Sequence, residues 1–352
     1  MSNPIKTLIT SFGMSGRVFH GPLINSHSRF QLAGVVQRTG HSANDVYPDV
    51  QVYSSLEEGL NTLKPELVIV NTPPFLHEQE ALQALAAGCH VVIEKPFATS
   101  VESADKILNT ALKAGLIVTA FQNRRWDSDF ITLRYALAFA DLGKISAFES
   151  HFDRFRPEVD LSSWKEQAHP GAGLVWNLGP HLADQAVLLF GMPDWVKATV
   201  RKQRENAQVD DYFNIQLGYP SFIAELKASY LVPNNKLKYV VHASNSSYIK
   251  MGIDIQENQL QKGYTPLDHG YGIEPQSQTS KIYSPDMKEA NYNPVSGNYH
   301  TFYDLLAEAI QSGKPAPVKP QEIRDVIEIL EAVYKSSKED RTLFFRNSTG
   351  KA

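Results

Sequence analysis

Residues 5–16 read IKTLITSFGMSG, a short apolar segment that runs directly into a turn with two glycines. From Ser11 to Gly16 this turn matches the dinucleotide-binding pattern G-x-G-x-x-G, except that Ser11 replaces the first glycine. Gly13 would let the backbone approach a pyrophosphate, and Gly16 would let the next helix pack closely on a sheet with its first amides facing the phosphates. The alternative is a strand-to-helix turn that uses glycine for its shape alone. The candidate cofactor-binding residues of the turn are Phe12, Gly13, Met14 and Gly16.

The segments that follow this turn alternate between strand and helix patterns. Further apolar runs, which we predict as strands, cover residues 31–36, 66–72, 90–95 and 116–122. Helical patterns cover residues 15–26, 54–63, 76–87 and 100–114, and capping boxes mark the start of two of them, Ser54 with Glu57 and Thr99 with Glu102. Strands separated by helices indicate a parallel, doubly wound sheet. We therefore predict an α/β fold with a Rossmann NAD(P)-binding domain over residues 1–124.

The pattern changes after about Arg125. The run DYFNIQLGY alternates with a period of two, and FIAELKASY, KYVVHA and SYIKM continue it between turn residues. These runs predict half-buried antiparallel strands in an α+β domain over residues 125–352. We expect long loops with little regular structure over residues 256–298, and helices over residues 299–311 and 321–337.

Composition narrows the class of protein. The chain has 352 residues, enough for two domains, and 42% of them are hydrophobic and 20% charged, as in ordinary globular proteins. With 34 basic and 38 acidic residues there is no basic excess, so nucleic acid is not an expected partner. The single cysteine, Cys89, is typical of a reducing compartment, and we expect the cytoplasm. We see no secretory signal and no apolar run near the ~20 residues of a membrane helix.

Two strand ends carry further candidate residues. The strand over residues 31–36 is followed by Gln37 and Arg38, where an NAD-specific site usually has a carboxylate. Arg38 could pair with a ribose 2′-phosphate, which favours NADP, or it could be an ordinary exposed arginine.

The strand over residues 90–95 ends in Glu94-Lys95-Pro96, where Lys95 could transfer a substrate proton. The alternative is a solvated surface lysine. The proline could form a cis peptide bond.

The second domain contains GAGLVWNLGPHLADQ, which places Asn177 and His181 on one face of a helix. His181 could relay a proton while Asn177 orients a substrate hydroxyl, or the histidine could be structural. We interpret His20, in RVFHGP, as helix packing or a cap. No ligand set suggests a metal site, and no G-x-S-x-G suggests a serine hydrolase.

Nearly the whole chain resembles the Gfo/Idh/MocA oxidoreductase family. The resemblance rests on SFGMSGRVFHGPL, NTPPFLHEQEALQALAAGCHVVIEKP, NRRWDSDF, ESHFDRFRPEV and GAGLVWNLGPHLADQAVLLFGMP. Within the family, NRRWD (residues 123–127), FRPEV, QRENAQVDDYF (203–213) and SGNYHTFY (296–303) resemble the NADP-dependent scyllo-inositol dehydrogenases.

This resemblance implies a C-terminal domain with a large open, mostly antiparallel sheet, which often forms the interface of homodimers or homotetramers, and an active site between the domains. It implies that Lys95 is the central catalytic lysine and that His181 is the general acid/base. The remaining positions that it implies are Thr72, Pro73, His77, Glu94, Gln122 and Asn123 at the cofactor, Trp164 at the cofactor or substrate, and Arg154, Arg156 and Asn177 at the substrate.

The chain departs from the family pattern at two of these positions. Ser11 is small enough for the turn to close. Asn177 replaces the common aspartate, and an amide cannot accept a proton, so acid/base work would fall to Lys95 and His181. We therefore expect an NADP(H)-dependent oxidoreductase acting on a secondary alcohol or ketone of a cyclic, inositol-like polyol or sugar. The alternatives are an NAD-dependent aldose dehydrogenase and a non-catalytic sugar or dinucleotide sensor.

Overall fold

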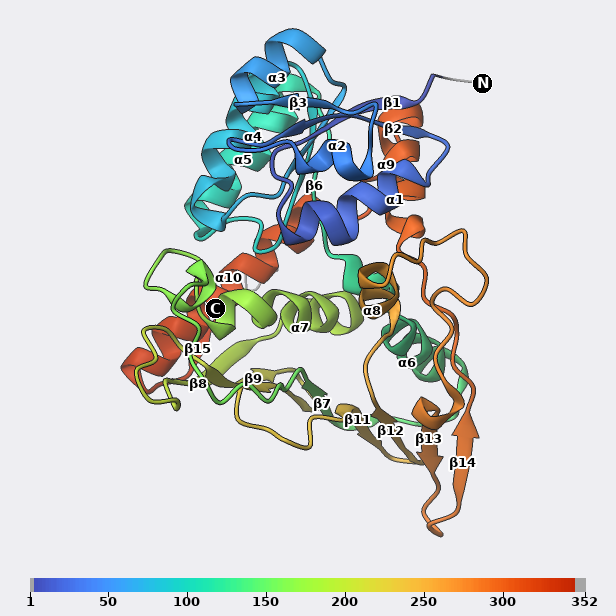
Figure 1. Ribbon diagram of the computed structural model, residues 1–352. Coiled ribbons are helices and arrows are strands. Elements are labelled where there is room, and N and C mark those ends of the chain that lie inside the picture. Colours follow the sequence, from blue (N-terminus) through green and yellow to red (C-terminus); the bar gives the residue numbers. More distant parts are fainter. Residues whose placement is uncertain (1–2, 346–352) are drawn as a thin grey trace. The chain divides into compact units, whose positions relative to one another are not determined.

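The computed structural model describes residues 3–345, which form two compact units (Figure 1). The first unit contains residues 3–126, 255–272 and 298–324, and the second contains residues 127–254, 273–297 and 325–345. The first long segment therefore ends close to the domain border expected after residue 124. Two later segments, which the sequence assigns to the second domain, also belong to the first unit.

Within the described residues, the first unit is built on a six-stranded parallel sheet with the order β3-β2-β1-β4-β5-β6. Its strands are β1 (Ile5–Ile9), β2 (Phe30–Val36), β3 (Gln51–Tyr53), β4 (Leu67–Val70), β5 (His90–Ile93) and β6 (Val118–Ala120). Every residue of β4 is buried, as expected for a strand that is covered on both faces. This order confirms the doubly wound Rossmann-type sheet, with its topological switch point between β1 and β4.

Helices cover both faces of this sheet (Figure 1). The α-helices of this part of the chain are α1 (Gly21–Asn25), α2 (Ser42–Val46), α3 (Leu56–Leu63), α4 (His77–Ala86) and α5 (Val101–Ala114). Short helical turns are η1 (Gly16–His20), η2 (Pro74–Leu76) and η3 (Asn123–Trp126). The N-caps of α3 and α5 each lie one residue later than predicted, because Ser55 accepts from the Glu58 amide and Ser100 from the Ser103 amide.

Later segments complete the first unit with α8 (Gln256–Gln261) and α9 (His300–Ser312). Helix α9 packs against α1, and Phe302 contacts Phe121 with the ring centroids 5.0 Å apart. Thr119 Oγ1 both donates to the Val318 carbonyl and accepts from the Val318 amide, at 3.0 and 3.2 Å. These contacts explain why residues near 300 fold with the first domain. Helix α10 (Pro320–Glu339) begins in the first unit and ends in the second.

Within the described residues, the second unit contains a nine-stranded sheet with the order β14-β13-β12-β11-β7-β10-β9-β8-β15. All its neighbours are antiparallel except β7 and β10, which confirms a large, mostly antiparallel sheet. Its strands are β7 (Ile145–His151), β8 (Trp195–Arg201), β9 (Tyr212–Gly218), β10 (Ile223–Ser229), β11 (Leu237–Ala243), β12 (Ser247–Met251), β13 (Ser280–Tyr283), β14 (Glu289–Tyr292) and β15 (Leu343–Phe344). Phe213, Ile215 and Leu217 of β9 are fully buried, as the period-two pattern predicts.

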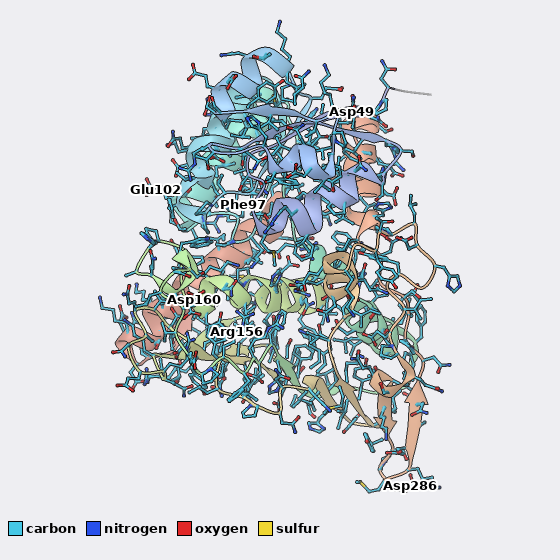
Figure 2. All side chains as sticks on the ribbon, viewed as in Figure 1. Asp49, Phe97, Glu102, Arg156, Asp160 and Asp286 are labelled. Carbon is cyan, nitrogen blue, oxygen red and sulfur yellow. The ribbon has the colours of Figure 1, made fainter. Side chains whose placement is uncertain are left out.

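Besides the end of α10, the described part of the second unit contains the helices α6 (Ser128–Phe139), α7 (Leu174–Phe190), η4 (Trp164–Glu166) and η5 (Gln276–Gln278). Helix α7 lies along one face of the sheet and packs on β9 and β10 (Figure 1). Residues 256–298 are more regular than the expected long loops, because they form α8 and the β13–β14 hairpin. The hairpin escapes detection because β14 is mostly exposed and carries no apolar alternation. Asp286 lies in its exposed connection (Figure 2).

Candidate functional site

The turn after β1 is tightly built around Gly16. A Cβ atom at Gly16 would lie 2.3 Å from the Ser11 carbonyl oxygen, so no larger residue fits. Gly13 and Met14 are exposed, whereas Phe12 is 6% exposed and packs against Val35, Ala43 and Val50. Only the main chain of Phe12 is therefore available to a cofactor. The Ser11 hydroxyl accepts from the Gly13 amide at 3.2 Å, so serine stabilises the turn at the first-glycine position.

Arg38 is exposed just beyond the carboxyl end of β2. Gln37 is already engaged, since its side chain accepts from the Ala43 amide and donates to Ser42 at the start of α2. A carboxylate that sequence reasoning missed lies within electrostatic range of Arg38. This is Glu80 of α4, which accepts a 2.8 Å hydrogen bond from Thr72 Oγ1. Burial raises the pKa of Glu80, while the Thr72 hydroxyl and Arg38 oppose that shift.

The segment after β4 is held by a buried histidine. The ring of His77, 1% exposed, contacts the Thr72 carbonyl through Nε2 at 2.8 Å and the Pro96 carbonyl through Nδ1 at 2.9 Å. Burial lowers the pKa of His77. The ring therefore ties the Thr72-Pro73 segment to the Lys95-Pro96 segment, and any influence of His77 on a cofactor acts through their positions.

Lys95 follows the carboxyl end of β5 and is half-buried. The Lys95–Pro96 peptide bond is cis. Phe97, two residues further on, is 2% exposed, whereas Glu102 of α5 is exposed (Figure 2). The main-chain N–H of Lys95 donates to the Glu94 carboxylate at 2.9 Å. Lys95 therefore lies beside a carboxylate at the sheet edge where doubly wound folds bind ligands.

Gln122 and Asn123 follow β6 at the same carboxyl edge, and each is 5% exposed. Within the described residues, Gln122 Oε1 is buried without a hydrogen-bond partner. A buried amide oxygen that lacks a donor is costly unless a bound group satisfies it.

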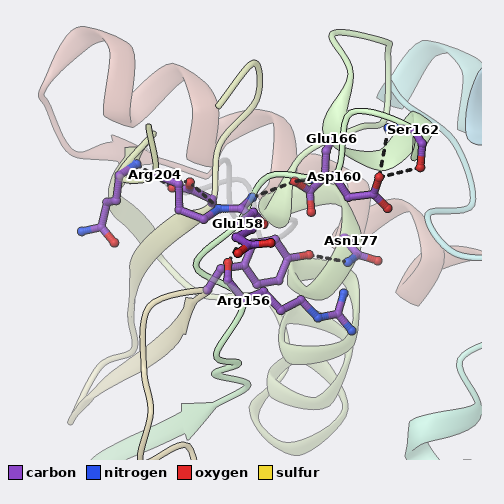
Figure 3. A network of polar contacts seen from close by, with 10 residues as sticks. Arg156, Glu158, Asp160, Ser162, Glu166, Asn177 and Arg204 are labelled. Carbon is purple, nitrogen blue, oxygen red and sulfur yellow. Dashed lines mark hydrogen bonds and ion pairs between the residues drawn. The ribbon is translucent and has the colours of Figure 1, made fainter. Parts of the chain in front are cut away.

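In the second unit, Asn177 and Tyr230 lie together. Tyr230 directly follows β10, and its hydroxyl accepts a hydrogen bond of 3.2 Å from Asn177 Nδ2 on α7 (Figure 3). The guanidinium carbon of Arg156 lies 5.7 Å from the centroid of the Tyr230 ring. The structure thus brings together the predicted residues Asn177 and Arg156 through a tyrosine that sequence reasoning missed. A tyrosine at a strand end has no distinguishing local signal.

His181 lies one turn after Asn177 and is 5% exposed. Its ring centroid lies 6.1 Å from that of Phe152, and the Arg154 guanidinium carbon lies 4.8 Å from the Phe152 ring centroid. Phe152 therefore links the predicted residues His181 and Arg154. Trp164 begins η4, farther along the connection after β7, and is half-buried.

A buried arginine organises the connection that carries these residues (Figure 3). Arg204, with a side chain 2% exposed, pairs with Asp211 at 3.0 Å and Glu166 at 3.1 Å. It also donates to the carbonyls of Arg156 and Glu158, at 3.1 and 2.8 Å. Its guanidinium carbon lies 4.6 Å from the Tyr230 ring centroid.

A cavity of about 720 Å³ lies beside this network and is lined in part by Arg156, Glu158, Asp160, Lys165, Glu166 and Tyr230. Its size suits a small polar ligand, since ligand pockets commonly measure about 300–1,000 Å³. Its lining combines cations, carboxylates and a phenol, which are groups that hydrogen-bond hydroxyls.

Among residues 3–345, no cluster of three or more His, Cys, Asp or Glu side chains could hold a metal ion. No helix in the same range is long and apolar enough to cross a membrane.

Comparisons with known proteins match both parts of the chain. Residues 5–122 match the model of the oxidoreductase family's NAD-binding Rossmann fold, and residues 135–344 match that of its C-terminal alpha/beta domain. The chain belongs to the Gfo/Idh/MocA oxidoreductase family. A relative from Bacillus subtilis strain 168, scyllo-inositol 2-dehydrogenase (NADP(+)) IolW, is 37% identical over 97% of this chain and 96% of its own. The uncharacterized oxidoreductase YdgJ of Escherichia coli K12 is 34% identical over 97% of this chain and 99% of its own.

Solved structures agree with this Gfo/Idh/MocA assignment. The oxidoreductase yvaA from Bacillus subtilis superposes with a TM-score of 0.94 at 36% identity, covering 98% of this chain and 99% of that chain. An oxidoreductase from Yersinia pestis superposes with a TM-score of 0.92 at 33% identity and covers 99% of both chains.

The first unit fits the dinucleotide that this family domain binds. Gly16 closes the turn, Gly13 and Met14 are exposed at it, and the first amides of a helix have no partner within the helix. Gln122 Oε1 offers an acceptor for a group that carries N–H donors. The residues present therefore suit a nicotinamide dinucleotide at the carboxyl edge of the parallel sheet.

Proposed function

We propose that this family member is an NADP(H)-dependent oxidoreductase that interconverts a secondary alcohol and a ketone on a cyclic, inositol-like polyol or sugar. The observation that carries the proposal is Lys95, half-buried at the carboxyl edge of the sheet and adjacent to the buried Glu94. The activity named for the B. subtilis relative, an NADP-linked scyllo-inositol dehydrogenase, supports the substrate class and the cofactor.

The bound nicotinamide supplies the hydride acceptor or donor. The turn from Ser11 to Gly16 would hold the pyrophosphate, and Arg38 would pair with the ribose 2′-phosphate. In alcohol oxidation, Lys95 Nζ would take the hydroxyl proton as the hydride leaves carbon, and in ketone reduction it would return that proton to oxygen.

The second unit would recognise the hydroxyls of the substrate. Asn177 cannot exchange a proton, so we assign it to orientation and assign His181 to proton transfer with Lys95. Arg156 and Tyr230 line the cavity whose polar groups suit a polyol. Arg154 lies against Phe152, and we propose that it contributes to substrate binding.

We also propose a homodimer or homotetramer formed through the second unit's sheet, to be checked by light scattering on the purified protein. The single cysteine, Cys89, is buried and donates to the Pro65 carbonyl, which makes it unsuited to a disulfide. On this basis we propose the cytoplasm as the compartment.

Initial rates of nicotinamide absorbance test the function, with scyllo-inositol, myo-inositol and glucose each paired with NADP and NAD. We expect turnover with NADP and an inositol, and a loss of about two orders of magnitude or more in Lys95→Ala. Turnover with NAD and glucose alone would favour the aldose dehydrogenase. Binding of NADPH without turnover of any of these substrates would favour the sensor. Full activity in Lys95→Ala would remove the lysine from the mechanism.

A further inference from the structure

Behind Lys95, three buried side chains from distant segments form a hydrogen-bonded chain. Glu94 follows the end of β5, and its Oε2 accepts a hydrogen bond from the Lys95 amide. Its Oε1 lies 3.2 Å from His20 Nε2. His20 belongs to η1, and its Nδ1 lies 2.8 Å from the hydroxyl oxygen of Tyr303 in α9. His20 and Tyr303 are both 0% exposed. We call Glu94, His20 and Tyr303 the supporting triad.

The chemistry of these groups indicates which atoms of the triad carry a hydrogen. Burial works against an ionised Glu94, but the hydrogen bond and charge of His20, the charge of Lys95 and the Lys95 amide together lower the pKa of this carboxyl. An ionised carboxylate only accepts, so His20 Nε2 must carry the hydrogen that it donates to Glu94. Burial raises the pKa of Tyr303 well above its usual value, so the phenol keeps its proton. The 2.8 Å contact between the phenol and His20 Nδ1 completes the chain.

Lys95 is one of four titratable groups that face Glu94. The groups facing Glu94 are His20 from η1, His77 from α4, Tyr303 from α9 and Lys95 itself. His77 contacts two carbonyls, and burial lowers its pKa. Tyr303 stays neutral.

We propose that the supporting triad positions Lys95 and keeps it in the ammonium form, with Glu94 supplying the negative charge and His20 and Tyr303 holding that charge in place. The inference deepens the proposed function, because it rests on Lys95 as the group that exchanges the substrate proton. Glu94, His20 and Tyr303 are positioning residues in this proposal, since they act through Lys95. An ammonium poised in this way is the form that donates a proton to a ketone oxygen.

Removing the charge of Glu94 is the direct test. In Glu94→Gln we expect Lys95 to lose its proton about one pH unit lower or more, as for a carboxylate removed from the side of a cation. His20→Phe keeps a ring against Phe121, whose centroid is 4.4 Å away, but removes the donor to Glu94. The buried carboxyl then takes up a proton more readily, so we expect a shift of Lys95 in the same direction. His20→Gln, which keeps an N–H donor, should shift Lys95 less.

The measurement is the pH dependence of trace labelling of Lys95 by acetic anhydride in the full-length protein, read by peptide mass spectrometry. It needs no substrate and reports the lysine itself. His90→Phe is the matched control, because His90 lies at the other end of β5 and accepts from the Ile117 amide instead. We expect the pH dependence of Lys95 labelling in this control to match that of the unsubstituted protein. Tyr303→Phe, which removes one hydroxyl, gives a second variant if the His20 substitutions do not fold, and should shift Lys95 in the same direction by a smaller amount.

The outcomes separate this inference from the proposed function. A folded Glu94→Gln with unchanged labelling of Lys95 would overturn the triad. Shifted labelling in a protein that turns over no polyol would support the triad and reject the proposed substrate class. If polyol turnover is found, the alkaline limit of ketone reduction should move down with the labelling curve. An unmoved limit would show that the triad does not act on the reaction.

Discussion

Arg204→Met provides the strongest test of how the second unit is built. The substitution keeps an unbranched side chain of similar length but removes the guanidinium that pairs with Asp211 and Glu166. Both carboxylate side chains are poorly accessible, at 0% and 10% exposure. Breaking a buried ion pair typically costs about 3–5 kcal/mol because the remaining charge is uncompensated.

The partners left behind set where in that range the loss should fall. Asp211 still accepts from the amides of Gln203 and Arg204, and Glu166 still accepts from the Asp160 amide. The carbonyls of Arg156 and Glu158 lose their donor. These remaining bonds lead us to expect about 3 kcal/mol, the lower end of that range.

Urea denaturation followed by circular dichroism measures this loss, and steady-state kinetics measures its effect on the site. Because Arg204 holds the connection that carries Arg156, we expect a several-fold rise in the KM for the polyol with little change in NADPH affinity. Arg201→Met is the control, since Arg201 is exposed and its guanidinium donates to the Val200 carbonyl. A loss below about 1 kcal/mol in Arg204→Met would refute the reasoning, because it would show that the carboxylates do not depend on this arginine.

Three further predictions address the cofactor, the substrate and acid stability. Arg38→Ala should weaken NADP binding at least tenfold and leave NAD binding nearly unchanged in calorimetric titrations. Arg29→Ala, at the other end of β2, should affect the binding of neither cofactor. Equal weakening of NADP and NAD binding in Arg38→Ala would contradict the 2′-phosphate pairing. Tyr230→Phe removes the acceptor of the Asn177 amide and should raise the KM for the polyol several-fold. The Tyr219 hydroxyl donates to the Gly191 carbonyl instead, so Tyr219→Phe should leave this KM unchanged. Identical kinetics in the two variants would show that Tyr230 does not contribute to substrate binding. Burial lowers the pKa of His300 from 6.5 to about 4, so the unfolded chain binds the extra proton first and stability should fall as the pH drops from about 6.5 towards 4. His300→Gln should flatten that fall in urea titrations, and an unchanged pH slope would show that His300 does not cause it.

The sequence alone determined the features that depend on neighbouring residues. The turn from Ser11 to Gly16 follows a strand, the alternating strands and helices form a parallel sheet, and Phe213, Ile215 and Leu217 share a buried face. Each of these is specified by turn chemistry or periodicity over a few residues. The predicted N-caps were wrong by one residue for a related reason, since consecutive residues such as Ser54 and Ser55 offer the same hydroxyl.

Only the tertiary structure decided which distant side chains meet. His20 could be interpreted from sequence as packing or a cap, because its partners Glu94 and Tyr303 are separated from it by 74 and 283 positions. Arg204 had no local signal, since its role depends on Glu166 and Asp211. Local patterns record how a segment folds, whereas a buried charge selects its partners through desolvation and hydrogen bonding in the assembled core. The site's chemistry therefore becomes visible only when strands, helices and late segments such as α9 are packed together.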